Sequence, residues 1–225
     1  MPFISSIDEL NNAFYEDQDQ RRYHLPRSKQ FFDQAMQEIG LEPSSILCLS
    51  RSWISEHLAE TGADVSFPQD LDGSQYDLVI AIDEILTREK DESAQKRLIS
   101  NIMQLVKPGG FLMASLRDYR NTNCHRRPLG DSCYNMLGSD EMVTTEVNQL
   151  DGKNKQAWRQ KLHVVINDSE LACLDLGHRR TLYFKQMAKY CTDAGASTFA
   201  VSKNLHWKGH LRRMPENIAF AGRSA

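Results

Sequence analysis

The chain has 225 residues, 40% of them hydrophobic and 25% charged, with a formal net charge of −3. This length and composition predict a globular protein with a full core and exclude a disordered chain. The small negative charge argues against bulk binding to nucleic acid. No apolar run approaches the roughly 18 residues needed to cross a membrane, and the first residues do not resemble a secretory signal, so we expect a cytoplasmic protein.

The first part of the chain predicts a helical cap. A capping-box spelling at Ser6 predicts a helix over residues 7–15. After a polar interruption, a second helix is predicted over residues 27–39, ending at Gly40. We expect these helices to form an N-terminal cap over residues 1–40.

Short elements follow the cap. Residues 45–49 predict a brief apolar strand and residues 54–60 a helix. Residues 63–67 are a strand candidate, and residues 68–74 are expected to form a loop.

The longest regular pattern spans residues 76–119. Residues 77–82 are almost continuously apolar, as in a strand buried on both faces of a parallel sheet. Residues 88–106 carry a helical apolar stripe on a charged segment. Lys107-Pro-Gly-Gly110 then stops the helix, and residues 111–115 predict another strand. Together they predict a βαβ unit with a right-handed crossover.

The composition changes after residue 119. Residues 120–140 are rich in Asn, Arg, Pro, Gly and Ser, which predicts a loop or lid. Alternating apolar and polar residues over 142–176 predict an antiparallel meander, with turns at Asp151-Gly152 and Asn167-Asp168.

The chain closes with a predicted helix over residues 182–194 and an antiparallel strand pair at 197–203 and 217–222. These elements predict an α/β fold: a Rossmann-like, mostly parallel sheet of about six strands flanked by helices, with an antiparallel C-terminal strand pair and a small inserted antiparallel sheet. We expect one domain over residues 1–225, with the lid loop and inserted sheet at 120–178.

The strand Tyr76-Asp-Leu-Val79 and the turn Leu105-Val-Lys-Pro-Gly-Gly-Phe-Leu112 resemble the second half of class I S-adenosylmethionine-dependent methyltransferases. The resemblance extends weakly over residues 28–223. The inserted sheet, with Leu116-Arg-Asp-Tyr-Arg-Asn121 before it, is distantly similar to members of the glycine-methyltransferase type, which methylate small amines. This resemblance implies a small-molecule substrate rather than nucleic acid.

The cofactor loop of that family follows the first strand, where a Gly-x-Gly sequence lets the cofactor approach the backbone. This chain has no glycine between Ser50 and Ser55. If S-adenosylmethionine binds, the resemblance and the helix start implicate the hydroxyls of Ser50 and Ser52, backbone amides of the next helix, and Trp53 stacking on the purine. The alternative for Trp53, which we favour, is packing in the core.

The region between the first strand and Tyr76 is short. About 30 residues separate Ile46 from Tyr76, whereas two further strands with their helix usually need roughly 55. The strand at 63–67 matches family strand two with a helix-free connection, but it fits better as strand three. On that alignment strand two and its ribose-binding acid are deleted, and Asp70 corresponds to the acid beside the adenine.

Polar residues elsewhere supply further candidates. Asp83 and Glu84 end the Tyr76 strand, a position that lines the methyl-transfer cavity in the family, so they are catalytic candidates and Asp83 also a cofactor candidate; a capping or solvated carboxylate pair is the alternative.

Two pairs of arginines lie in or near the predicted lid: Arg126 with Arg127, and Arg179 with Arg180. If the two pairs converge, they would clamp a substrate carboxylate or phosphate through bidentate contacts. The alternative is that all four side chains lie in solvated loops.

No metal site is predicted. The five cysteines are scattered without a CxxC pair. His206 and His210 are four residues apart, but Gly209 argues against a helix and no acid stands at metal-ligand spacing.

Two functions fit these observations. The first is a divergent S-adenosylmethionine-dependent methyltransferase acting on a small polar or anionic metabolite. The second is a methyltransferase-like protein that has lost its cofactor and serves as a binding or assembly subunit, with a protein partner or a second copy of itself.

Overall fold

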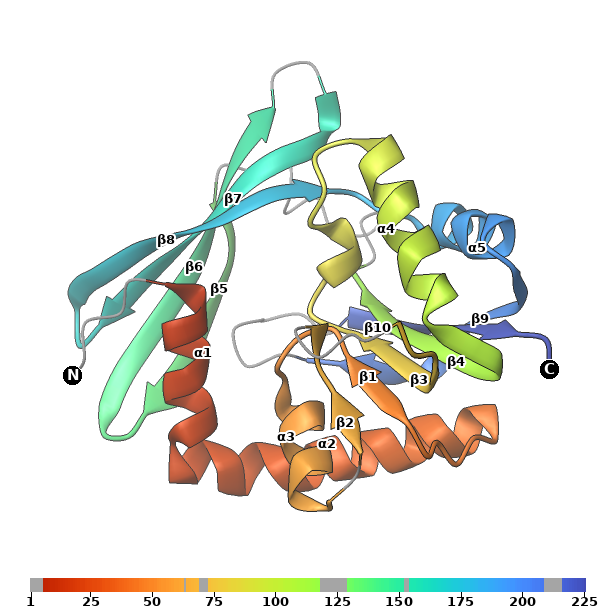
Figure 1. The fold of residues 1–225 in the computed structure, drawn as a ribbon. Helices are drawn as coiled ribbons and strands as arrows, with labels where there is room; N and C mark the ends of the chain where they lie inside the picture. The colour runs from red at the N-terminus through yellow and green to blue at the C-terminus, as the bar shows by residue number, and fades with distance from the viewer. Residues whose placement is uncertain (1–5, 63, 69–72, 118–128, 152–153, 209–215) are drawn as a thin grey trace.

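Two β-sheets organise the chain (Figure 1). The computed structural model describes residues 6–62, 64–68, 73–117, 129–151, 154–208 and 216–225. None of the helices in these ranges is long and apolar enough to cross a membrane.

The larger sheet has six strands in the order β2-β1-β3-β4-β10-β9. Its strands are β1 (Ile46–Cys48), β2 (Val65–Ser66), β3 (Tyr76–Ala81), β4 (Val106–Leu116), β9 (Ala196–Trp207) and β10 (Glu216–Arg223). The first four pair in parallel, and β10 runs antiparallel between β4 and β9. The predicted mixed sheet with its antiparallel closing pair is confirmed.

The smaller sheet is an antiparallel meander of four strands. They are β5 (Leu129–Leu137), β6 (Asp140–Asp151), β7 (Asn154–Ile166) and β8 (Ser169–Arg180). The turn at Asn167 and Asp168 has φ of 45° and 62°, as a tight hairpin requires. The loop predicted for residues 120–140 is wrong from residue 129 onward, because β5 pairs there with β6.

Five α-helices are described: α1 (Ile7–Glu16), α2 (Gln18–Ile39), α3 (Trp53–Glu60), α4 (Glu92–Gln104) and α5 (Phe184–Asp193). The Asp17 side chain accepts a hydrogen bond from the Gln20 amide and caps α2. This helix therefore starts nine residues before the predicted Arg27. The polar residues that suggested an interruption lie largely on its exposed side.

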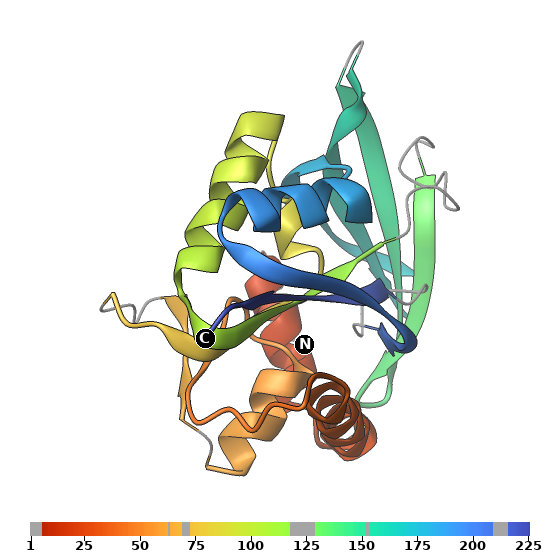
Figure 2. The ribbon, with the colours of Figure 1, turned by 90° about the vertical axis from the view of Figure 1, so that its right-hand side faces the viewer.

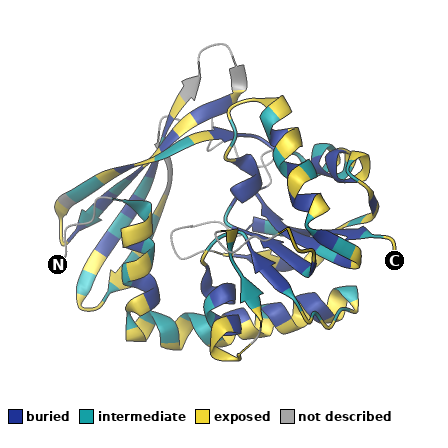
Figure 3. Cartoon of the chain, in the orientation of Figure 1, coloured by how far each residue is buried: buried dark blue, intermediate teal, exposed yellow. Residues whose placement is uncertain are grey.

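The helices cover the six-stranded sheet on both faces (Figures 1 and 2). In β3, Leu78 and Ile80 face the core formed with α1, α2 and α3, whereas Val79 and Ala81 face the core formed with α4 and α5. The central strands are accordingly buried, whereas the outer helix surfaces and the antiparallel sheet carry exposed residues (Figure 3). This explains the continuous apolar spelling of β3.

Asp77 is the charged residue in the otherwise apolar sequence of β3. Its carboxylate accepts hydrogen bonds from the amides and hydroxyls of Ser44 and Ser45, and Lys107 Nζ lies 3.0 Å away. Hydrogen bonds from Ser44 hold the pKa of Asp77 well below its usual range. One side chain thus joins β1, β3 and β4 at the amino edge of the sheet.

The position of β2 corrects the alignment of the shortened region. Val65 pairs in parallel with Ile46, so β2 lies directly beside β1. That is the place of the second strand in a Rossmann-type order, where the third lies one position further out. The preference for strand three was wrong: β2 fills the second position, and none of the described residues forms a third strand outside it.

Candidate functional site

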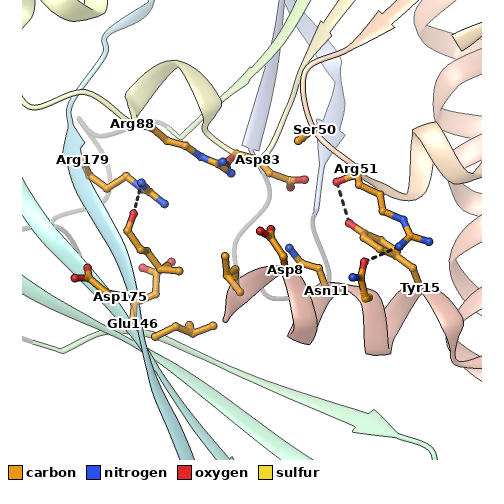
Figure 4. A pocket seen from close by; sticks show the side chains of 14 residues that line it. Asp8, Asn11, Tyr15, Ser50, Arg51, Asp83, Arg88, Glu146, Asp175 and Arg179 are labelled. Atoms are coloured by element: carbon orange, nitrogen blue, oxygen red, sulfur yellow. Dashed lines mark hydrogen bonds between the residues drawn. The ribbon is translucent and has the colours of Figure 1, made fainter. Parts of the chain in front are cut away.

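A cavity of about 400 Å³ lies at the carboxyl ends of β1 and β3. The helix α1 and the antiparallel sheet form its other walls (Figure 4). Its polar lining includes Asp8, Asn11, Asn12, Tyr15, Ser50, Arg51, Asp83, Arg88, Glu146, Asp175 and Arg179. The volume and mixed lining suit a small molecule that carries charge.

Ser50 is the first residue of this lining after β1. Its hydroxyl is buried and has no hydrogen-bond partner among the described residues. Because an unpaired buried hydroxyl costs free energy, a ligand group that reaches Ser50 would gain a hydrogen bond there.

Ser52 and Trp53 lie beneath the cavity and do not line it. Ser52 and Ser55 cap α3 reciprocally, and both are 1% exposed. The Trp53 ring stacks on His24 with centroids 4.9 Å apart and meets Tyr15 edge-on at 4.9 Å. The geometry therefore favours the packing alternative for Trp53, whose side chain is also 1% exposed.

Arg51 connects the loop after β1 to α1. Its carbonyl oxygen accepts a hydrogen bond from the Tyr15 hydroxyl at 3.1 Å. Its guanidinium donates to Asn12 at 2.6 Å (Figure 4) and to Glu56 at 2.7 Å. Burial raises the pKa of Tyr15 well above its usual value, so the hydroxyl stays protonated as a donor. Side-chain hydrogen bonds therefore hold this loop against α1 and α3, at the position where the resembled family has glycines without side chains.

Asp83 and Glu84 adopt an unusual backbone at the end of β3. Their φ angles are 59° and 57°, a left-handed conformation that costs free energy for residues with a Cβ. The Asp83 carboxylate accepts a hydrogen bond from Trp207 Nε1 at 2.9 Å and lines the cavity. Consecutive strained residues at a cavity edge are a recurrent feature of functional sites.

Glu84 turns away from the cavity into a buried ionic triad. The Arg117 guanidinium contacts both oxygens of Glu146, at 3.0 and 3.2 Å, and lies 3.5 Å from Glu84. All three side chains are at most 5% exposed. The triad fixes the ends of β3 and β4 to the antiparallel sheet. Sequence reasoning missed Arg117 and Glu146, although an arginine directly after a buried strand was a signal.

The predicted arginine clamp is not assembled by the described residues. Arg179 lines the cavity and donates to the Leu176 carbonyl at 2.8 Å. Arg180 points to the other side of β8, 2.9 Å from Gln156 Oε1 and 3.5 Å from Glu92, as alternation along a strand requires. Arg126, Arg127 and Asp70 lie outside the described residues.

Known proteins resemble this chain only in structure. No protein-family model matches it, and no curated protein matches significantly. Streptomyces venezuelae DesVI is 12% identical with a TM-score of 0.62, covering 89% of this chain and 92% of its own. A Clostridium acetobutylicum S-adenosylmethionine-dependent methyltransferase is 13% identical with a TM-score of 0.58, covering 87% and 90%. The sugar N-methyltransferase KedS8 from Streptoalloteichus is 11% identical with a TM-score of 0.59, covering 99% and 94%.

The chain has the fold of an S-adenosylmethionine-dependent methyltransferase. In this methyltransferase fold the cavity lies where β1 and β3 would present a cofactor to a substrate. Its polar residues fit the amino-acid end of S-adenosylmethionine, to which Ser50 offers an unpaired hydroxyl. None of the described lining residues comes from β2, so they provide no counterpart for the ribose.

Proposed function

We propose that the chain is a divergent S-adenosylmethionine-dependent methyltransferase that acts on a small polar or anionic metabolite. The observation that carries this proposal is the cavity at the carboxyl edge, with its unpaired Ser50 hydroxyl and its charged lining. When bound, the cofactor would supply an electrophilic methyl group. The fold supports this reading, but fold alone does not determine function.

The residues of the cavity divide into three roles in this proposal. Ser50 and the loop after β1 hold the amino-acid end of the cofactor. Arg179 and Arg88 attract an anionic group of the substrate, while Asp83 orients its nucleophilic atom. The helix α1 and the antiparallel sheet restrict water, because they form the walls opposite the strand ends.

A second candidate is supported by the closed loop. The Tyr15 hydroxyl donates a hydrogen bond to the Arg51 carbonyl, and Asn12 and Glu56 accept hydrogen bonds from the Arg51 guanidinium. The segment that contains Arg51 has no glycine. These contacts favour a protein that no longer binds the cofactor and uses the cavity for another small molecule, as a binding or assembly subunit.

Calorimetric titration with S-adenosylmethionine and S-adenosylhomocysteine separates the candidates. The methyltransferase proposal expects both to bind, with affinity reduced about tenfold in Ser50→Ala. The matched control is Ser197→Ala, whose hydroxyl donates to the Gly222 carbonyl on the far strand pair. A free ligand concentration of 100 times the dissociation constant would stabilise the protein by about 2.7 kcal/mol.

The absence of binding at millimolar ligand would contradict the proposal. Binding recovered in Arg51→Gly, which removes the side chain held by Asn12 and Glu56, would then support the second candidate. Equal losses in Ser50→Ala and Ser197→Ala would remove Ser50 from the site.

A further inference from the structure

A second cavity of about 600 Å³ lies between α2, β5 and the end of β9. It shares no described lining residue with the first cavity. We call it the α2–β5 groove; the lining residues that matter here are Tyr23, His24, Arg27, Tyr134, Trp207 and Lys208. Neither the methyltransferase fold nor the proposed function uses it.

The walls of the groove are held in place before any ligand arrives. Gln20 Nε2 on α2 donates to the Met136 carbonyl on β5 at 2.7 Å. The Gly138 amide in the β5–β6 turn donates to Asp17 at 2.8 Å. These contacts fix α2 against the antiparallel sheet, so a ligand would not bear the cost of ordering the groove.

Apolar exposure is concentrated at this place. Four large hydrophobic side chains of the described chain are exposed, and three of them, Tyr23, Tyr134 and Met136, line the groove. The residues Tyr23 and Tyr134 are 54% and 58% exposed. Clustered exposed rings on a folded protein indicate a binding surface.

The groove lining carries two cations, Arg27 and Lys208, and one acid, Asp19. No ion pair with a described residue is found for Arg27 or Lys208, and the Arg27 guanidinium lies 3.6 Å from the centre of the Tyr23 ring. The acid of the lining, Asp19, lies 3.6 Å from Arg22 on the same helix. Arg27 and Lys208 are therefore available to an anionic ligand.

His24 contributes polarity but no charge at neutral pH. Burial, followed by the nearby charges of Arg27 and Lys208, lowers the pKa of His24 to about 4. Its imidazole thus offers one donor and one acceptor.

We propose that the α2–β5 groove binds a planar aromatic ring that carries a phosphate, of which a nucleoside monophosphate is the simplest example. The ring would contact Tyr23 and Tyr134, and the phosphate would be held by Arg27 and Lys208. Such a ligand needs both an aromatic surface and a pair of cations, and the groove joins the two.

The test is calorimetric titration at low salt with adenosine monophosphate, adenosine and inorganic phosphate. The monophosphate is expected to bind, and each fragment to bind at least about tenfold more weakly. Arg27→Gln and Lys208→Gln are each expected to weaken monophosphate binding about tenfold. Lys29→Gln is the matched control, since it removes a charge from the same helix outside the groove lining, and its partner Asp33 also lies outside that lining. Equal melting temperatures would show that the variants are folded.

Four results would overturn the inference. The first is no monophosphate binding at millimolar concentration. The second is an equal loss in Lys29→Gln and Arg27→Gln, which would mean general charge attraction. The third is a loss in Ser50→Ala without one in Arg27→Gln, because the monophosphate would then occupy the first cavity. A single-stranded oligonucleotide that binds at least about tenfold more tightly would also overturn it, in favour of a polymer.

Discussion

Two units of the six-stranded sheet, β3–α4–β4 and β1–α3–β2, are held together by different interactions. In the β3–α4–β4 half the strands have six and eleven residues, and backbone constraints are strict. In the β1–α3–β2 half the strands have three and two residues, and side chains close the connecting loop. The first unit therefore depends on long strand pairing, whereas the second depends on side-chain hydrogen bonds.

The difference is clear at Gly110 and in the loop after β1. A Cβ on Gly110 would lie 2.7 Å from the Asp77 carbonyl oxygen, so β3 and β4 leave no space for any side chain there. The loop after β1 instead carries Ser50, Arg51 and Ser52 in place of the glycines of the resembled family. We call the β3–α4–β4 unit the scaffold half and the β1–α3–β2 unit the altered half; the loop after β1, in the altered half, lines the cavity.

Removing the charge at the end of the scaffold half should have the largest effect. Arg117→Met removes the buried guanidinium that contacts both Glu84 and Glu146, which should lower the free energy of unfolding by about 3 to 5 kcal/mol in urea denaturation. The control is Arg159→Met, whose partner Asp175 is exposed; it should cost about 1 kcal/mol or less. Equal effects would mean that the triad does not stabilise the sheet junction.

A substitution of the strict glycine should follow. Gly110→Ala forces the new Cβ against three backbone oxygens, at 2.7 to 3.1 Å, and should cost about 3 kcal/mol. Gly62→Ala, at the end of α3, meets no atom within 4 Å and has a φ of 72°, so it should cost only about 1 kcal/mol. The prediction fails if the two substitutions are equally tolerated.

The helix that covers the altered half should make stability depend on pH. The unfolded chain binds a proton on His24 below its ordinary pKa near 6.5, whereas the folded chain binds it only near 4. Stability should therefore fall by about 1 to 3 kcal/mol as pH drops from 6.5 to 4. His24→Gln should flatten this part of the denaturation profile, while His178→Gln, at an exposed position of β8, should leave it unchanged.

The smallest effect should come from the loop closure itself. Tyr15→Phe removes the hydrogen bond to the Arg51 carbonyl and should cost about 1 kcal/mol. Tyr190→Phe serves for comparison, because it also removes one hydrogen bond of a tyrosine hydroxyl, in this case to Glu92 beside the scaffold half. A Tyr15→Phe protein as stable as the wild type would show that the hydroxyl does not hold the loop closed.

The sequence predicted those parts of the fold that depend on neighbouring residues. Apolar runs and glycines located β3, α4 and β4, and the alternation after Met142 located β6 to β8. It failed at β5, because that strand is stabilised by pairing with β6 rather than by its own spelling. It also failed at the start of α2, because polar residues on one exposed helix face resemble a loop.

The cavity was predicted only in part, for a similar reason. Ser50 and Asp83 follow strands directly, so their place at the carboxyl edge follows from the order of elements. The contributions of Tyr15 and Glu146 depend on packing between distant segments, which no local pattern reports. Arg179 and Arg180 were paired in the prediction, yet a strand separates neighbours onto opposite faces.

The position of β10 between β4 and β9 affects how the protein can fold during synthesis. Ser115 on β4 donates to Glu216 on β10, a contact across 101 residues. At a translation rate of roughly 5 to 20 residues per second, the apolar edge of β4 waits about 5 to 20 seconds for its neighbour. An unpaired strand edge invites association with other chains. During that interval the nascent protein would depend on chaperones or on its own transient structure to stay separate.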